Sequence, residues 1–118
     1  MDTRRKLPAN LDLDEMGSHA GNAAQLLKAL ANEKRLLILC MLAEGERSVG
    51  ELNTALDLSQ SALSQHLAVL REEGLVDTRR EAQTIYYSVT PGPALEVIRT
   101  LHGIYCAPRR AGKGASKR

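Results

Sequence analysis

The stretch Ser59–Gly74, SQSALSQHLAVLREEG, contains the clearest helical pattern in this chain. On a helix of about 3.6 residues per turn, small polar side chains fall on one face and apolar side chains on the other. The polar face comprises Gln60, Ser61, Ser64, Gln65 and Ala68, and the apolar face comprises Ala62, Leu63, Leu67, Val69 and Leu70. Ser59 is a typical N-terminal cap, and Gly74 suits the left-handed residue that follows a helix. Both ends of this helix are therefore defined.

The polar face of this helix is suited to DNA. Short side chains that both donate and accept hydrogen bonds match the edges of base pairs in the major groove. From these residues alone, the ordinary solvated face of an amphipathic helix remains the alternative. His66 falls within the apolar side, so we expect a hydrogen-bonded structural role for it rather than a base contact.

The preceding segment predicts a second, shorter helix. Ser48 begins it with a capping box, because Glu51 follows three residues later. The helix runs to about Leu56, and Asp57-Leu58 form a tight turn into the next helix. These elements together predict a helix-turn-helix.

The following segment predicts a β-hairpin and a last helix. Residues 75–80 and 84–90 read as strands, and Glu81-Ala82-Gln83 separate them. A hairpin that follows a recognition helix is a wing. The last helix begins at Thr90-Pro91, because Pro is accepted at a first helical position, and it ends near Cys106.

Two further helices precede the helix-turn-helix. The first starts at about Asp14 and carries a stripe of small and apolar side chains, namely Met16, Ala20, Ala23, Ala24, Leu27 and Leu30. Asn32 caps the second helix, which contains the apolar run LLILCML at residues 36–42 and ends at Gly45. This helix should be buried on most of its circumference.

The predicted fold class is mainly α (α+β): a winged helix-turn-helix with four helices, a β-hairpin and a fifth helix. We expect one domain at residues 13–107, a mobile N-terminal segment at 1–12 and a basic disordered tail at 108–118. The chain has no Phe, no Trp and three Tyr among 118 residues, so its core must be built from smaller apolar side chains. Such a core is thin, and a second copy would help to stabilise it.

The positive charge lies at the two ends of the chain. Residues 1–6 carry a net charge of +2 and residues 107–118 one of +5, which leaves −5 for residues 7–106. Non-specific attraction of phosphate to the folded part should therefore be modest. No apolar run has the length of a membrane span, and no signal peptide or catalytic motif is present, so we expect a cytoplasmic protein that is not an enzyme.

These motifs resemble the ArsR/SmtB family of bacterial winged-helix repressors. The resemblance runs from Leu26 to about Cys106 and is carried by LLKALANEKRLLIL, SVGEL, LSQSALSQHLAVLREEGLV and TRREAQTIYYSV. It implies a homodimer that binds an inverted-repeat operator in double-stranded DNA. It also implies that the first helix forms half of the dimer interface; a helix that packs only within its own core is the alternative.

The predicted DNA-binding residues lie on the recognition helix and the wing. They are Gln60, Ser61, Ser64 and Gln65 on the helix, and Arg79, Arg80 and Gln83 on the hairpin. The helix residues would read bases, and the two arginines would position the protein on phosphates.

Metal sensing, which many family members perform, is not expected here. Where such members have a pattern like ELCVCDL, residues 51–58 read ELNTALDL and lack both thiols. Members of another type bind the metal along the last helix, which offers only Glu96 and His102 in this chain. We therefore predict neither a metal nor another cofactor.

Cys40 and Cys106 are the remaining candidates for chemistry. From composition alone, the two cysteines are best interpreted as small core residues, since structural disulfides are rare in the cytosol. The flanks LLILCML and LHGIYC resemble the dithiol subgroup of the family, of the SqrR, BigR and HlyU type, which senses persulfides. This resemblance implies that a disulfide or short polysulfide joins Cys40 to Cys106, with a persulfide or other sulfane-sulfur species as the effector.

Burial in an apolar helix should raise the pKa of Cys40, whereas attack on sulfur requires a thiolate. We therefore expect Cys106 to react first and Cys40 to resolve the intermediate. The alternatives are a constitutive winged-helix regulator or anti-repressor with inert cysteines, a metal-responsive repressor with an atypical site, and a winged helix that binds another protein.

Overall fold

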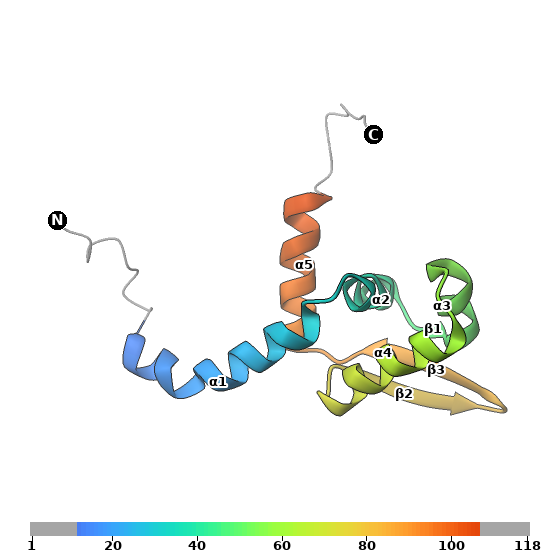
Figure 1. The fold of residues 1–118 in the computed structure, drawn as a ribbon, viewed down its shortest axis with the longest axis horizontal. Helices are drawn as coiled ribbons and strands as arrows, with labels where there is room; N and C mark the ends of the chain where they lie inside the picture. The colour runs from blue at the N-terminus through green and yellow to red at the C-terminus, as the bar shows by residue number, and fades with distance from the viewer. Residues whose placement is uncertain (1–11, 107–118) are drawn as a thin grey trace.

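The computed structural model describes residues 12–106, so the predicted tail at 108–118 and nearly all of the predicted segment at 1–12 lie outside the described residues. The helices are α1 (Leu13–Leu30), α2 (Glu33–Glu44), α3 (Val49–Leu56), α4 (Gln60–Glu72) and α5 (Pro93–Tyr105). The strands are β1 (Arg47–Ser48), β2 (Val76–Glu81) and β3 (Thr84–Val89). This order confirms the predicted winged helix-turn-helix (Figure 1).

The predicted caps of the helix-turn-helix are present. The Ser48 hydroxyl accepts a hydrogen bond from the Glu51 N–H (3.1 Å), and the Glu51 carboxylate accepts one from the Ser48 N–H (2.8 Å). The Ser59 hydroxyl accepts a hydrogen bond from the Ala62 N–H at the start of α4 (3.1 Å). Asp57, with a φ of 53°, makes the left-handed turn between the two helices. These local interactions fix the directions of α3 and α4.

The sheet contains one strand more than the sequence predicted. β1 pairs antiparallel with β3, so the strand order is β1-β3-β2. A strand of two residues is too short to show a periodicity in the sequence. Its pairing depends on residues about 40 positions away. The hairpin turn is also shorter than predicted: Glu81 pairs with Thr84, and Ala82, with a φ of 57°, occupies the left-handed position without the usual Gly or Asn.

The predicted start of the last helix at Thr90-Pro91 is wrong. The Thr90 N–H donates a hydrogen bond to the Leu75 carbonyl (2.9 Å), which keeps the chain beside the base of the hairpin. Gly92 takes the cap position, and Pro93 takes the first helical position instead. The chemical reason for the prediction holds, but it applies to the second proline.

The core surrounds α2. Ile38, Leu39 and Leu42 are buried, and α2 contacts α1, α3, α4, α5 and β3. The other buried residues are Ala29, Leu30, Leu52, Leu56, Leu63, Leu67, Leu70, Leu75, Val76, Tyr87, Ala94 and Ile98. The core is thus aliphatic, as predicted, with Tyr87 as its one buried aromatic side chain among the described residues.

Most of α1 and the end of α5 extend away from this core (Figure 1). Within α1 only Ala29 and Leu30 are buried, and Leu13 and Leu27 are 73% and 55% exposed. Ile104 and Tyr105 at the end of α5 are 64% and 81% exposed. Of the predicted α1 stripe, only Leu30 belongs to the intramolecular core, and Met16, Ala20, Ala24 and Leu27 are exposed. Within residues 12–106, no helix has the length and apolar character needed to cross a membrane.

Candidate functional site

The polar face of α4 is open to solvent. Gln60, Ser61, Ser64 and Gln65 are all exposed, and none of these side chains forms a hydrogen bond within residues 12–106. On the opposite side of α4, Leu63, Leu67 and Leu70 are buried. The predicted division of the helix into two faces is confirmed, and the polar groups are available to an external partner.

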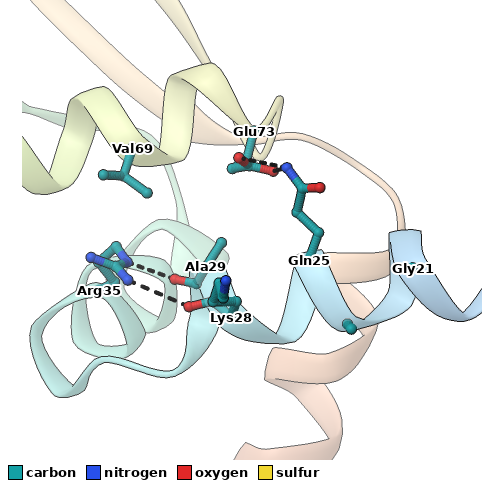
Figure 2. A pocket seen from close by; sticks show the side chains of 8 residues that line it. Gly21, Gln25, Lys28, Ala29, Arg35, Val69 and Glu73 are labelled. Atoms are coloured by element: carbon teal, nitrogen blue, oxygen red, sulfur yellow. Dashed lines mark hydrogen bonds between the residues drawn. The ribbon is translucent and has the colours of Figure 1, made fainter.

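Both ends of α4 are tied to other elements. At the start, the Asn53 amide donates a hydrogen bond to the Leu58 carbonyl in the turn (2.6 Å). At the end, the Gln25 amide of α1 donates hydrogen bonds to both carboxylate oxygens of Glu73 (3.1 Å each), as Figure 2 shows. The orientation of α4 is therefore coupled to α1.

Near the contact between Gln25 and Glu73, Arg35 of α2 bonds to the end of α1. Its Nε donates a hydrogen bond to the Ala29 carbonyl (2.6 Å) at the end of α1 (Figure 2). A cavity of about 510 Å³ lies between these residues and α4, and Val69 and Glu73 line its α4 side. The cavity is open, and within its lining Gln25 already bonds to Glu73 and Arg35 to the Ala29 carbonyl.

His66 is half-buried on α4. Its pKa is lowered by burial and by the positive charges of Arg35 and Lys34. Within the described part of the chain, His66 has no hydrogen-bond partner, so the predicted hydrogen-bonded role is not found. A neutral imidazole that fills space at the edge of the core agrees with both observations.

The wing residues Arg79, Arg80 and Gln83 are exposed. Arg79 is engaged in ion pairs with Glu46 (2.8 Å) and Glu81 (3.0 Å). Among the described residues, Arg80 forms no ion pair. The two arginines, which the sequence did not distinguish, therefore have different environments.

The structure brings Cys40 and Cys106 to one cavity. Cys40 lies half-buried on α2, and Cys106 lies exposed directly after α5. Both thiols line a cavity of about 450 Å³ whose other walls are Leu37, Ala43, Glu44, Ile98, Arg99 and His102. The cavity thus combines apolar walls with charged groups, and both thiols are free.

Burial raises the pKa of Cys40, and the neighbouring Cys106 and Glu44 add to this increase. This direction is the one predicted from the apolar sequence around Cys40. At neutral pH, Cys40 is therefore a thiol rather than a nucleophilic thiolate. Within residues 12–106, no group of three or more His, Cys, Asp or Glu residues is arranged to hold a metal ion.

An exposed polar recognition helix, a capped supporting helix and a wing define a winged-helix DNA-binding protein. Residues 32–78 match the family described as "Bacterial regulatory protein, arsR family". Together with the relatives below, this match shows that the chain belongs to the ArsR family of transcriptional regulators, in the group that includes HlyU and BigR. It is a regulator rather than an enzyme.

Three comparisons illustrate the relationship. The transcriptional activator HlyU of Vibrio cholerae is 55% identical over 98 residues, which cover 83% of this chain and 91% of that protein. The biofilm growth-associated repressor of Agrobacterium fabrum is 48% identical over a match that covers 92% of this chain and 97% of that protein. The crystal structure of the transcriptional repressor BigR from Xylella fastidiosa has a TM-score of 0.76 at 42% identity, covering 83% of this chain and 100% of that chain.

Sequence reasoning missed the acidic residues around both sites. Glu44 beside Cys40 ends α2, and Glu46 beside Arg79 lies between the predicted end of the second helix at Gly45 and the Ser48 cap. The one available signal was the high density of acidic residues in the folded part of the chain. That signal does not say which carboxylate meets which partner.

The raised pKa of Cys40 predicts slow alkylation. In Cys106→Ser protein, we expect the modification of Cys40 by iodoacetamide to accelerate only above the pH at which an ordinary thiol ionises. Glu44→Gln should move this profile to lower pH by a minor part of the shift, because burial is the main cause. Mass spectrometry across a pH series measures both profiles, with Glu33→Gln at the far end of α2 as the control. A Cys40 profile like that of a free thiol would contradict the buried environment.

Proposed function

We propose that the chain is a homodimeric repressor that binds an inverted-repeat operator while its thiols are reduced. A sulfane-sulfur species would link Cys40 to Cys106 and release the DNA. The observation that carries this proposal is the shared cavity: two cysteines from distant parts of the sequence line one space between α2 and α5. The cavity is open to solvent and Cys106 is exposed, so a small sulfur compound has access to this space.

The linking chemistry follows from thiol–disulfide exchange. A cysteine thiolate attacks the outer sulfur of a persulfide RSSH, the S–S bond breaks, and the thiol RSH leaves, so the cysteine becomes a persulfide. Attack by the second thiol on the protein-bound sulfur gives a disulfide and releases hydrogen sulfide. If both cysteines first become persulfides, the same attack gives a trisulfide and hydrogen sulfide. The exposure of Cys106 and the raised pKa of Cys40 support Cys106 as the first nucleophile.

A bridge at this cavity would act on the helices that hold the DNA-reading elements. α2 contacts α3 and α4, and α5 packs against α2. Release of the operator requires a coupling between bridge and DNA of only about 1 to 3 kcal/mol. A small change in the relative positions of α2 and α5 is sufficient for this, since it alters the spacing of the two recognition helices in a dimer.

Exposed apolar side chains on α1 and α5 support the proposal of a dimer. Leu13, Met16 and Leu27 on α1, with Ile104 and Tyr105 on α5, are exposed in the single chain. Apolar side chains gathered on two extended helices are typical of a surface that a partner covers. A winged helix that binds an unrelated protein is less well supported, because the α4 face is uncharged and lacks the aromatic centre of such interfaces.

Base reading by α4 is tested by two substitutions. Gln60→Ala and Gln65→Ala should each weaken binding to an operator, selected from a random DNA library, by about 1 to 3 kcal/mol per half-site because a base contact is lost in each. Binding to unrelated DNA should change little. Asn22→Ala on α1, which removes an exposed amide outside the recognition helix, is the matched control, and fluorescence anisotropy measures both affinities. An equal loss on both kinds of DNA would remove base reading from the proposal.

The dimer is tested by a charge placed on the exposed α1 stripe. Ala24→Glu should give monomers and abolish operator binding together, because each half-site is bound too weakly alone. Ser18→Glu adds the same charge to the opposite face of α1 and should remain dimeric. Sedimentation velocity measures the assembly state. An unchanged sedimentation coefficient for Ala24→Glu would exclude this face as the interface.

The switch is tested by removing each thiol. Cys40→Ser and Cys106→Ser should bind the operator like the parent protein but should not release it after persulfide treatment, because one sulfur cannot form the bridge. Peroxide should release the parent protein poorly. Anisotropy measures release, and mass spectrometry measures the added sulfur. If either single variant responds like the parent, the cysteines are inert and the protein is a constitutive regulator.

A further inference from the structure

Arg79 lies at the centre of an ion-paired cluster on the wing. Its Nε and Nη2 donate hydrogen bonds to the two carboxylate oxygens of Glu46 (3.0 and 2.8 Å), and its Nη1 donates one to Glu81 (3.0 Å). Its guanidinium also lies over the Tyr86 ring, 4.7 Å from the ring centre. All three guanidinium nitrogens therefore have carboxylate partners.

The strand register places the two wing arginines on opposite faces of the sheet. Arg79 pairs with Tyr86, and Arg80 pairs with Ile85. Because successive side chains of a strand alternate in direction, Arg80 shares the face of the buried Tyr87, whereas Arg79 lies on the outer face. α4 contacts the hairpin through β2. The hairpin then runs back along α4 (Figure 1).

Glu46 connects the wing to the rest of the molecule. It lies 33 residues before Arg79, between the end of α2 and β1, and β1 leads directly into the Ser48 cap of α3. Arg79 also holds the pKa of Glu46 below its usual range through the hydrogen bond and the charge, so this carboxylate stays ionised. The bidentate pair thus joins β2 of the wing to the segment that enters the helix-turn-helix.

We propose that Arg79 is a positioning residue that fixes the wing through Glu46, and that Arg80 supplies the wing's phosphate contact. A DNA phosphate at Arg79 would have to displace two carboxylates from a group whose summed charge is −1. Arg80 carries no such competitor among the described residues. This inference revises the expected role of Arg79 and rests on the proposed operator binding.

Charge-preserving variants separate geometry from charge. Lys cannot reproduce the bidentate pairing of Arg79, and Asp is too short to replace Glu46. Arg79→Lys and Glu46→Asp should each weaken operator binding about three- to fivefold, the range of a well-formed surface pair, with little effect on unrelated DNA. The double variant should bind no worse than either single variant, because both remove the same contact.

The salt dependence distinguishes the two arginines. Arg80→Ala should weaken binding to operator and unrelated DNA alike, and should reduce the slope of log K against log salt by about 0.9 per protomer, or about 1.8 for the proposed dimer. Arg80→Lys should keep the slope, since it keeps the charge. Arg79→Lys should also keep the slope while losing affinity for the operator. Thermal unfolding of every variant checks that the fold is retained.

Two results would overturn the inference. In the first, Arg79→Lys binds like the parent and Arg79→Ala lowers the salt slope as Arg80→Ala does. Arg79 would then be a phosphate contact. In the second, Arg79→Lys and Glu46→Asp both bind the operator with the affinity of the parent, and their salt slopes are unchanged. Arg79 would then have no role in DNA binding. If the parent protein itself shows no preferred DNA sequence, the proposed function fails instead.

A measurement without DNA tests the positioning directly. Arg79→Lys and Glu46→Asp should shift the backbone amide resonances of Ala82 and Gln83 at the wing tip in the free protein, and Glu33→Asp, which shortens a carboxylate at the start of α2, should not. Unchanged wing resonances in both of the first two variants would contradict a positioning role, whatever the DNA binding shows.

Discussion

The burial of α2 holds the other helices and the sheet together. Ile38 and Leu39 have no exposed surface, and each fully buried side chain of this size contributes about 1.5 to 3 kcal/mol relative to an exposed one. α2 contacts four other helices and β3. Because the chain contains no Phe and no Trp, this aliphatic helix takes the central place that larger side chains often occupy. A shift of α2 would disturb every contact at once, because protein interiors are close-packed.

The elements that the sequence predicted well are those with local causes. The capping box of α3, the Ser59 cap and the left-handed Gly74 each depend on residues a few positions apart. β1 and the start of α5 were missed or misplaced because both depend on distant backbone partners. Arg47 pairs with Tyr87, and Leu75 holds Thr90. A short segment of sequence does not encode such partners.

The candidate sites divide in the same way. The polar face of α4 follows from helical periodicity, so it could be predicted from the residues alone. The proximity of Cys40 and Cys106 came from a family resemblance, because no local rule relates residues so far apart. The Glu46–Arg79 pair could not be predicted at all. Two neighbouring arginines look alike in a sequence, and only the strand register separates the one that meets carboxylates from the one that does not.

The position of Cys40 explains how the proposed bridge to Cys106 could affect the recognition helix and the wing. Cys40 directly follows the buried Leu39, so a bridge from Cys40 acts on a helix that is held in the core rather than on a mobile loop. Cys106 lies after an α5 end that extends beyond that core (Figure 1). A bridge between them would therefore move α5 toward α2, since α5 has fewer contacts to lose. In the proposed dimer the exposed end of α5 belongs to the interface, so such a movement would change the distance between the two recognition helices while each helix-turn-helix stays intact.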